Sequence, residues 1–242
     1  MTDVNEDRTL STVVAHVRDG GLVIIPTDTV YGIGTLASDA AAVARLLAAK
    51  GRGRQMPPPV LVAGPDQLDG VVGALPPAAQ ALMEAFWPGA LTIILDAAPD
   101  LGWDLGETGG TIAVRMPDHP LALELLRATG PMAVTSANHT GQPPATDAAS
   151  ARVAFPGHVR EAGSPGAGSP DRSEGDILLL DGGATPGPVP STIVSLAGDH
   201  AYSPRIIRDG VLSLSQLAVV LDPVLTQAGA SPMTAGSEVP RP

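Results

Sequence analysis

The sequence predicts a single α/β domain built on a mixed sheet with flanking helices. Short apolar strands alternate with amphipathic helices through most of the chain, which is typical of this fold class. The chain has 242 residues, of which 44% are hydrophobic, so it can bury one large core or at most two small ones. No internal repeat is present that would indicate a solenoid or propeller.

The first predicted elements are a helix, a buried strand and a loop. The helix, Thr9–Asp19, has its apolar residues on one face and ends at the Gly-Gly pair that follows it. The apolar run Leu22–Pro26 predicts a strand. A polar loop over Thr27–Gly34 follows directly, so its side chains are expected at the end of that strand.

The next segment predicts a second helix, a cationic turn, a strand and a third helix. The helix Ser38–Lys50 has its valine and leucines on one face, and it ends in the turn formed by residues 51–54, Gly-Arg-Gly-Arg. Val60–Ala63 predicts a strand. The third helix, Pro76–Phe86, opens with two prolines, which a first helical turn tolerates.

The remaining elements are predicted from the same periodicities and turn residues. The strands are Leu91–Leu95, Thr111–Arg115, Met132–Thr135, Ile177–Leu180, Thr192–Leu196 and Arg205–Arg208. The helices are His119–Ala128, Thr146–Ala154 and Ser213–Leu221. We therefore predict one domain over residues 1–222, with a flexible Gly/Ser/Pro-rich insertion at 156–175 and a disordered tail at 223–242.

Composition excludes several classes of function. The chain has 25 acidic and 14 basic residues and a net charge of −11, which disfavours strong direct binding to nucleic acid. It has no cysteine, so thiolate metal sites and cysteine nucleophiles are excluded. The acidic N-terminus does not resemble a signal peptide, and no apolar run approaches the ~20 residues of a membrane span. We expect a cytoplasmic protein with no membrane partner.

Polar residues follow several predicted strands, where α/β proteins usually place ligand sites. No Walker phosphate loop, no dinucleotide-binding glycine motif and no metal-ligand spacing is present, so we expect no protein-bound metal. The polar groups are PTDTVYG at 26–32, KGRGR at 50–54, TSAN at 135–138, and the pairs at 191–192 and 208–209, with Arg115 at another strand end. Each group taken alone is also consistent with a turn or a helix cap.

Lys50 is the only lysine of the chain, and all other basic side chains are arginines. Arginine can replace lysine at almost any solvated position, so a single retained lysine suggests a specific requirement for an ammonium group. The alternative is chance.

Taken in order, these segments resemble the YrdC/Sua5 family of L-threonylcarbamoyladenylate synthases, without the C-terminal domain of the longer Sua5 members. The resemblance rests on GGLVIIPTDTVYGIG, AAKGRGR, FWPGALTIIL, TIAVRMPDHP, VTSANHTGQPP, LLLDGG, STIVSL and IIRDG, from about Gly20 to about Leu221. It implies a twisted sheet around an open cationic cavity. The chain departs from the family pattern at Gly53, where many members have proline, and it has no histidine on the strand that follows.

The resemblance also implies roles for particular residues. Lys50 and Arg52 would be catalytic, and with Ser136 and Asn138 they would form the KxR…SxN set around ATP and product. Further nucleotide contacts would be Thr111, Thr146 and Arg208, and the threonine side would consist of Thr27, Thr29, Tyr31, Arg115 and Ser191.

The implied reaction converts ATP, L-threonine and bicarbonate into threonylcarbamoyl-AMP and pyrophosphate, with Mg²⁺ carried by the ATP. This is the first step in making N6-threonylcarbamoyladenosine in tRNA, and a separate tRNA threonylcarbamoyl transferase complex would take up the product. Two alternatives stay open: a non-enzymatic nucleotide- or RNA-binding module, and a paralogue that acts on another small molecule. The near absence of aromatic residues, 2% of the chain, disfavours the RNA-binding module because few rings could stack on bases.

Overall fold

A computed structural model describes residues 4–164, 167 and 177–233. In this part of the chain, ten strands form one mixed sheet, in the order β10-β9-β4-β5-β3-β6-β2-β1-β8-β7. The strands are β1 (Leu22–Ile25), β2 (Gly32–Leu36), β3 (Val60–Leu61), β4 (Leu91–Asp96), β5 (Thr111–Arg115), β6 (Met132–Ser136), β7 (Val159–Glu161), β8 (Ile177–Leu179), β9 (Thr192–Ser195) and β10 (Arg205–Arg208). The α-helices are α1 (Val4–Arg18), α2 (Ala40–Ala49), α3 (Pro77–Phe86), α4 (Pro120–Thr129), α5 (Ala148–Ala154) and α6 (Leu214–Gln227).

Parallel and antiparallel pairs are mixed within this sheet. The pairs β1–β2, β2–β6, β3–β6, β4–β5 and β9–β10 are antiparallel, whereas β1–β8, β3–β5, β4–β9 and β7–β8 are parallel. The predicted α/β class and mixed sheet are therefore confirmed. No helix in the described ranges is long and apolar enough to cross a membrane.

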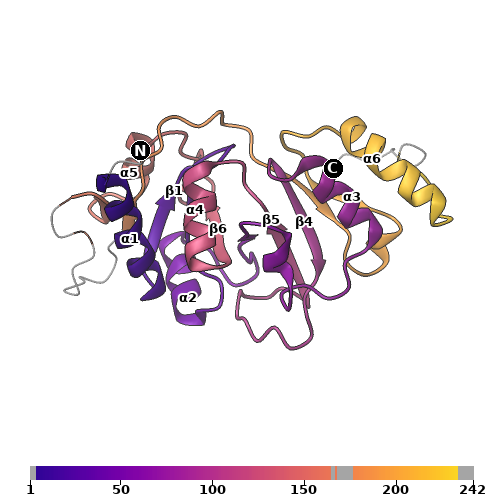
Figure 1. The fold of residues 1–242 in the computed structure, drawn as a ribbon, viewed down its shortest axis with the longest axis horizontal. Coiled ribbons are helices and arrows are strands. Elements are labelled where there is room, and N and C mark those ends of the chain that lie inside the picture. Colours follow the sequence, from indigo (N-terminus) through magenta and orange to yellow (C-terminus); the bar gives the residue numbers. More distant parts are fainter. Residues whose placement is uncertain (1–3, 165–166, 168–176, 234–242) are drawn as a thin grey trace.

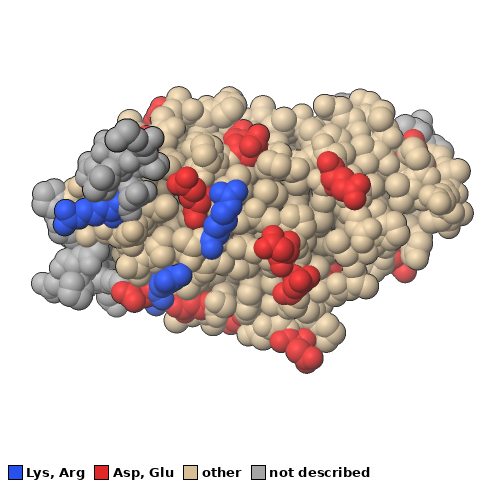
Figure 2. Space-filling view, in the orientation of Figure 1, with Lys and Arg blue, Asp and Glu red and all other residues tan. Residues whose placement is uncertain are grey.

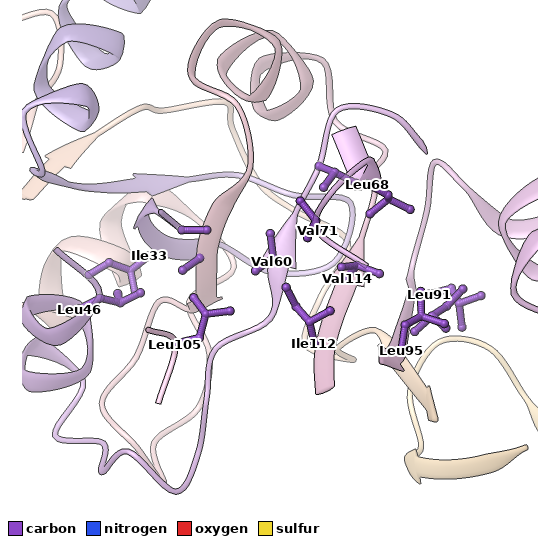
Figure 3. Close-up of a cluster of buried hydrophobic side chains, with 14 of the residues drawn as sticks. Ile33, Leu46, Val60, Leu68, Val71, Leu91, Leu95, Leu105, Ile112 and Val114 are labelled. Atoms are coloured by element: carbon purple, nitrogen blue, oxygen red, sulfur yellow. The ribbon is translucent and has the colours of Figure 1, made fainter. Parts of the chain in front are cut away.

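Helices pack at both ends of the sheet, as Figure 1 shows. Helices α1 and α4 pack against each other beside β1 and β6, and α3 and α6 form a second pair beyond β4. Buried side chains of the sheet connect the two ends. Val60, Ile112, Val114 and Leu91 belong to the main core, each at most 2% exposed (Figure 3). The core thus joins both halves of the sheet into one unit.

The structure corrects the predicted loop at 27–34, because Gly32–Leu36 forms strand β2 in the middle of the sheet. Two glycines weaken the strand signal in the sequence. They are needed for close packing: a Cβ at Gly34 would lie 2.6 Å from the carbonyl oxygen of Ala133, and one at Gly32 would lie 2.6 Å from Val134. Strand β2 therefore places Tyr31 and Gly32 next to β6.

The predicted end of the last helix at Leu221 is also wrong, because α6 continues through Pro223 to Gln227. Proline usually ends a helix when a sequence is read alone. Here Leu221 and Leu225 are at most 1% exposed and share a core-facing side, so burial favours the longer helix. Strand β7 likewise lies inside the predicted insertion 156–175. Parts of the predicted insertion and tail lie outside the described residues, namely 165–166, 168–176 and 234–242.

Candidate active site

A cavity of about 460 Å³ lies over one face of the central strands. Side chains alternate along a strand, so every second residue faces the same side. Thr111, Ala113 and Arg115 of β5 and Thr92 and Ile94 of β4 line the cavity in this way. The neighbouring residues Ile93, Leu95 and Val114 are buried in the core. The same alternation therefore builds both the floor of the cavity and the core beneath it.

One side of the cavity is a buried cluster after β1. The Thr27 and Thr29 hydroxyls lie 3.1 Å apart, and Thr27 donates a hydrogen bond of 2.7 Å to the Val30 carbonyl. Arg115 donates to the Thr29 hydroxyl at 3.2 Å and forms an ion pair of 2.6 Å with Asp28. Its side chain is only 7% exposed, so Asp28 compensates a charge that burial would otherwise make costly.

Tyr31 connects this cluster to the loop after β8. Its hydroxyl donates to the Gly183 carbonyl at 2.7 Å, lies 3.2 Å from Asp181, and accepts from the Gly182 backbone N–H at 3.1 Å. Burial and the nearby Asp181 carboxylate raise the pKa of Tyr31 to about 12. The phenol therefore stays protonated at neutral pH and holds the 181–183 turn against the cavity.

Arg208 and Ser191 form another wall. Arg208 donates to the Ser191 carbonyl through Nη2 at 2.7 Å and through Nε at 3.2 Å, and Nη2 also lies 3.0 Å from the Ser191 hydroxyl. The pKa of Arg208 is lowered by burial and by the positive charges of Arg115 and Arg52. Three guanidinium groups thus converge on one cavity, which favours an anionic ligand.

Arg52 lies on the cavity wall, and its Nε is buried without a hydrogen-bond partner among the residues that the structure describes. Burial lowers the pKa of its guanidinium. A buried donor without an acceptor costs free energy, so this nitrogen is expected to find its partner in a bound ligand.

Lys50 lies behind the cavity wall and does not line it. It is 1% exposed, and its Nζ donates to the carbonyl oxygens of Ser136 and Asn138 and, at 2.9 Å, to the Asn138 side-chain oxygen. The Ser136 hydroxyl also donates to that side-chain oxygen, at 2.6 Å. Burial and the charge of Arg52 lower the pKa of Lys50 to about 7. Lys50 therefore holds the turn that follows β6 in place.

Most residues nominated from the sequence meet at this cavity. Its lining includes Thr27, Thr29, Tyr31, Arg52, Thr111, Arg115, Ser136, Ser191 and Arg208. Lys50, Asn138 and Thr146 do not line it; Thr146 accepts a backbone hydrogen bond of 2.8 Å from Thr185.

Sequence reasoning missed Asp28 as the partner of Arg115, and it missed Thr92 altogether. Thr92 is a buried hydroxyl within the apolar run of β4, and that break in an apolar strand was the available signal. In the described part of the chain, no group of three or more His, Cys, Asp or Glu side chains could hold a metal ion.

The chain matches known proteins over most of its length. The Sua5/YciO/YrdC family model, described as "Telomere recombination", matches residues 15–210. A Mycobacterium tuberculosis protein named putative threonylcarbamoyl-AMP synthase is 45% identical over 214 residues, covering 88% of this chain and 89% of the relative. The Bacillus subtilis threonylcarbamoyl-AMP synthase is 38% identical over 228 residues, covering 93% of this chain but 60% of the relative.

Solved structures agree with these relatives. The crystal structure of Pyrococcus abyssi Sua5 complexed with L-threonine matches with a TM-score of 0.72 and 33% identity, over 88% of this chain and 57% of that one. Escherichia coli YciO matches with a TM-score of 0.70 and 25% identity, over 87% and 93% of the two chains. This chain thus spans little more than half of the Sua5 chain and nearly the whole of YciO. On the family match and the identities, the chain belongs to the Sua5/YciO/YrdC family.

Proposed function

We propose that this chain is an L-threonylcarbamoyladenylate synthase, a nucleotidyltransferase that forms threonylcarbamoyl-AMP and pyrophosphate from ATP, L-threonine and bicarbonate. The observation that carries the proposal is the convergence of Arg52, Arg115 and Arg208 on a cavity also lined by threonine and serine hydroxyls. Relatives at 35–45% identity that are named threonylcarbamoyl-AMP synthases support it.

We assign the two ligands to opposite sides of the cavity. L-threonine would occupy the pocket of Thr27, Thr29 and Arg115, beside Tyr31 and Ser191, where buried hydroxyls and a guanidinium suit an amino-acid carboxylate and side-chain hydroxyl. ATP would lie along Arg52 and Arg208, with Thr111 and Ser136 next to it. Lys50, Asn138 and Thr146, which do not line the cavity, would support the nucleotide side from behind.

The chemistry needs no protein nucleophile. The threonine amine condenses with bicarbonate and releases water, which gives a carbamate. A carbamate oxygen then attacks the α-phosphorus of ATP in line, the bond from that phosphorus to the bridging oxygen breaks, and pyrophosphate leaves. Two anions must approach each other, and charge accumulates on the leaving group. Fixed guanidinium groups address both difficulties, because they are positioned before the reaction begins.

Magnesium would enter with ATP as part of the substrate. The product would pass to a separate tRNA threonylcarbamoyl transferase complex. We also propose a cytoplasmic site of action, where ATP and tRNA are available.

A pyrophosphate-release assay tests the function. Release should require ATP, L-threonine and bicarbonate together. Arg52→Gln should reduce it at least roughly tenfold, equivalent to ~1.4 kcal/mol, with no fall in melting temperature, because the guanidinium that is removed has a buried nitrogen without a partner. ATP binding without release would indicate a nucleotide-binding module, and release that depends on another small molecule would indicate a paralogue. Either result would reject the proposal.

A further inference from the structure

Thr92 occupies an unusual position beneath the cavity. It lies on β4, is 1% exposed, and contributes to the cavity lining. Its Oγ1 lies 2.9 Å from the hydroxyl of Ser191, a residue 99 positions later that immediately precedes β9. The parallel pairing of β4 with β9, in which Leu91 is opposite Thr192, brings the two hydroxyls together. A buried hydroxyl in an apolar strand has a cost unless it is hydrogen-bonded, and Ser191 is the partner that it finds.

The same serine holds Arg208. Both the carbonyl and the hydroxyl of Ser191 accept hydrogen bonds from the guanidinium. Thr92 on β4, Ser191 just before β9 and Arg208 on β10 therefore form one continuous chain of hydrogen bonds. A guanidinium can only donate hydrogen bonds, so the hydroxyl oxygen of Ser191 accepts from Arg208. The hydrogen bond with Thr92 restricts the orientation of that hydroxyl.

A bulge in β10 turns Arg208 toward this chain. The β9–β10 register pairs Ile206 with Val194, but then pairs Arg208 with Ile193, so Ile207 is the extra residue. A bulge redirects the side chains that follow it. Ile193 lines the cavity, and Arg208, opposite it, faces the same side.

Arg115 and Arg208 are held in different ways. Asp28 compensates the charge of Arg115 through a 2.6 Å ion pair. Arg208 forms no ion pair with a carboxylate in the described part of the chain, and its partners on Ser191 are neutral. A neutral support orients the guanidinium and leaves its full charge for an anion, although Arg52 and Arg115 repel it.

We infer that Thr92 is a positioning residue, which acts through the Ser191 hydroxyl to hold Arg208 ready for the phosphates of the nucleotide. The inference deepens the proposed function and rests on it. It also explains how a serine assigned to the threonine side and an arginine assigned to the nucleotide side act as one unit.

The test compares variants of Thr92 that differ in the hydroxyl. Thr92→Val keeps the shape and removes the hydroxyl, and it should weaken ATP binding, measured by calorimetry, by roughly three- to tenfold. Thr92→Ser should bind ATP like the unmodified protein. If Thr92→Val does not fold, Thr92→Ala replaces it, because it differs from Thr92→Ser only by the hydroxyl oxygen.

Thr35→Val is the matched control. Thr35 is fully buried on β2, and its hydroxyl donates to the Gly21 carbonyl at 2.9 Å, away from the cavity. This variant should lose stability in the same way as Thr92→Val and keep its ATP affinity. An equal loss of affinity in both variants would mean that the effect is general, and would overturn the inference.

A double-mutant cycle tests whether Thr92 acts through Ser191. In a Ser191→Ala background, Thr92→Val should cause no further loss of ATP affinity, because the connecting hydroxyl is already absent. Independent, multiplicative losses would overturn the inference while leaving the proposed function intact. Failure of the unmodified protein to bind ATP would overturn both. Pyrophosphate release that needs all three substrates, together with ATP affinity unchanged in Thr92→Val, would support the function and reject the role of Thr92.

Discussion

At the scale of single residues, Lys50 shows why an ammonium is retained where every other cation is arginine. Lys50 is 1% exposed, and its Nζ donates to three oxygens, all of them acceptors. A planar guanidinium is larger and directs its donors differently, so it does not fit this arrangement. A neutral amine has only two protons, so it could donate to only two of the three oxygens.

The lowered pKa of Lys50 predicts that ATP binding takes up a proton. With a pKa of about 7 in the free protein, Lys50 is mostly neutral at pH 8. A phosphate anion at Arg52 neutralises a charge that lowers this pKa, so the pKa rises on binding and the amine becomes protonated. We expect net proton uptake at pH 8, measured by calorimetry in buffers of different ionisation enthalpy. Lys50→Arg is always charged and should take up none; uptake by that variant would place the titration elsewhere.

At the scale of elements, the long β4–β5 connection packs on the turn that carries Arg52. The Glu107 N–H donates to the Arg54 carbonyl at 2.8 Å, and the Arg54 guanidinium pairs with Asp104 at 2.7 Å. Leu105, in the same connection, is 3% exposed and belongs to the main core. The ion pair is about half exposed and contributes little, so backbone contact and Leu105 hold the two loops together.

Gly106→Ala should loosen this contact. Gly106 has a φ of +108°, and a Cβ there would lie 2.6 Å from the Arg54 carbonyl oxygen. Gly109, in the same connection, has a φ of +62°, and a Cβ there would meet no other atom within 4 Å, so it is the matched control. We expect Gly109→Ala to lower the free energy of unfolding by about 1 kcal/mol, because of its positive φ alone. Gly106→Ala should lower the free energy of unfolding further and should also raise the KM for ATP. Equal urea midpoints and equal KM values would argue against the contact.

Helix α6 gives a second prediction at this scale. Leu225 lies beyond the helix end expected from the sequence, yet it is 1% exposed. Leu225→Ala should reduce the free energy of unfolding by about 2–5 kcal/mol, as large-to-small changes in cores do. Val219→Ala, on the same helix at 76% exposure, should change it by less than about 0.5 kcal/mol. Urea unfolding of both variants decides, and a silent Leu225→Ala would mean that the C-terminal turns of α6 contribute nothing.

At the scale of the whole molecule, an acidic protein gathers three arginines around one cavity. The net charge is −11, and on the face shown in Figure 2 the Lys and Arg side chains are few and scattered among acidic ones. The arginines at 52, 115 and 208 instead converge on the cavity. A small polyphosphate can reach such a site, whereas a nucleic-acid backbone needs a continuous cationic surface.

This distribution predicts that tRNA does not bind directly with appreciable strength. In a gel-shift titration near 0.15 M salt, we expect no complex at protein concentrations below ~100 µM. An acidic surface repels the phosphate backbone, and the cavity is too small for a helix. Micromolar binding that weakens steeply with salt would contradict the prediction and indicate a cationic surface for tRNA.

The sequence by itself determined the fold class, most elements and most of the polar side chains that line the cavity. Short apolar runs specify β4 and β5, and the strand period of two places Thr111 and Arg115 on one face. Such local patterns can be read from the chain because the physical cause, which is the geometry of the strand, is itself local.

Only the tertiary structure decided what depends on contacts between distant segments. Strand β2 and the end of α6 are stabilised by close packing and burial that override weak local propensity. The structure placed Lys50 behind the cavity, because its partners, Ser136 and Asn138, come from a turn 86–88 residues away. It likewise joined Thr92 to Ser191 across 99 residues of chain. No local pattern encodes such pairs, since strand order alone brings them together.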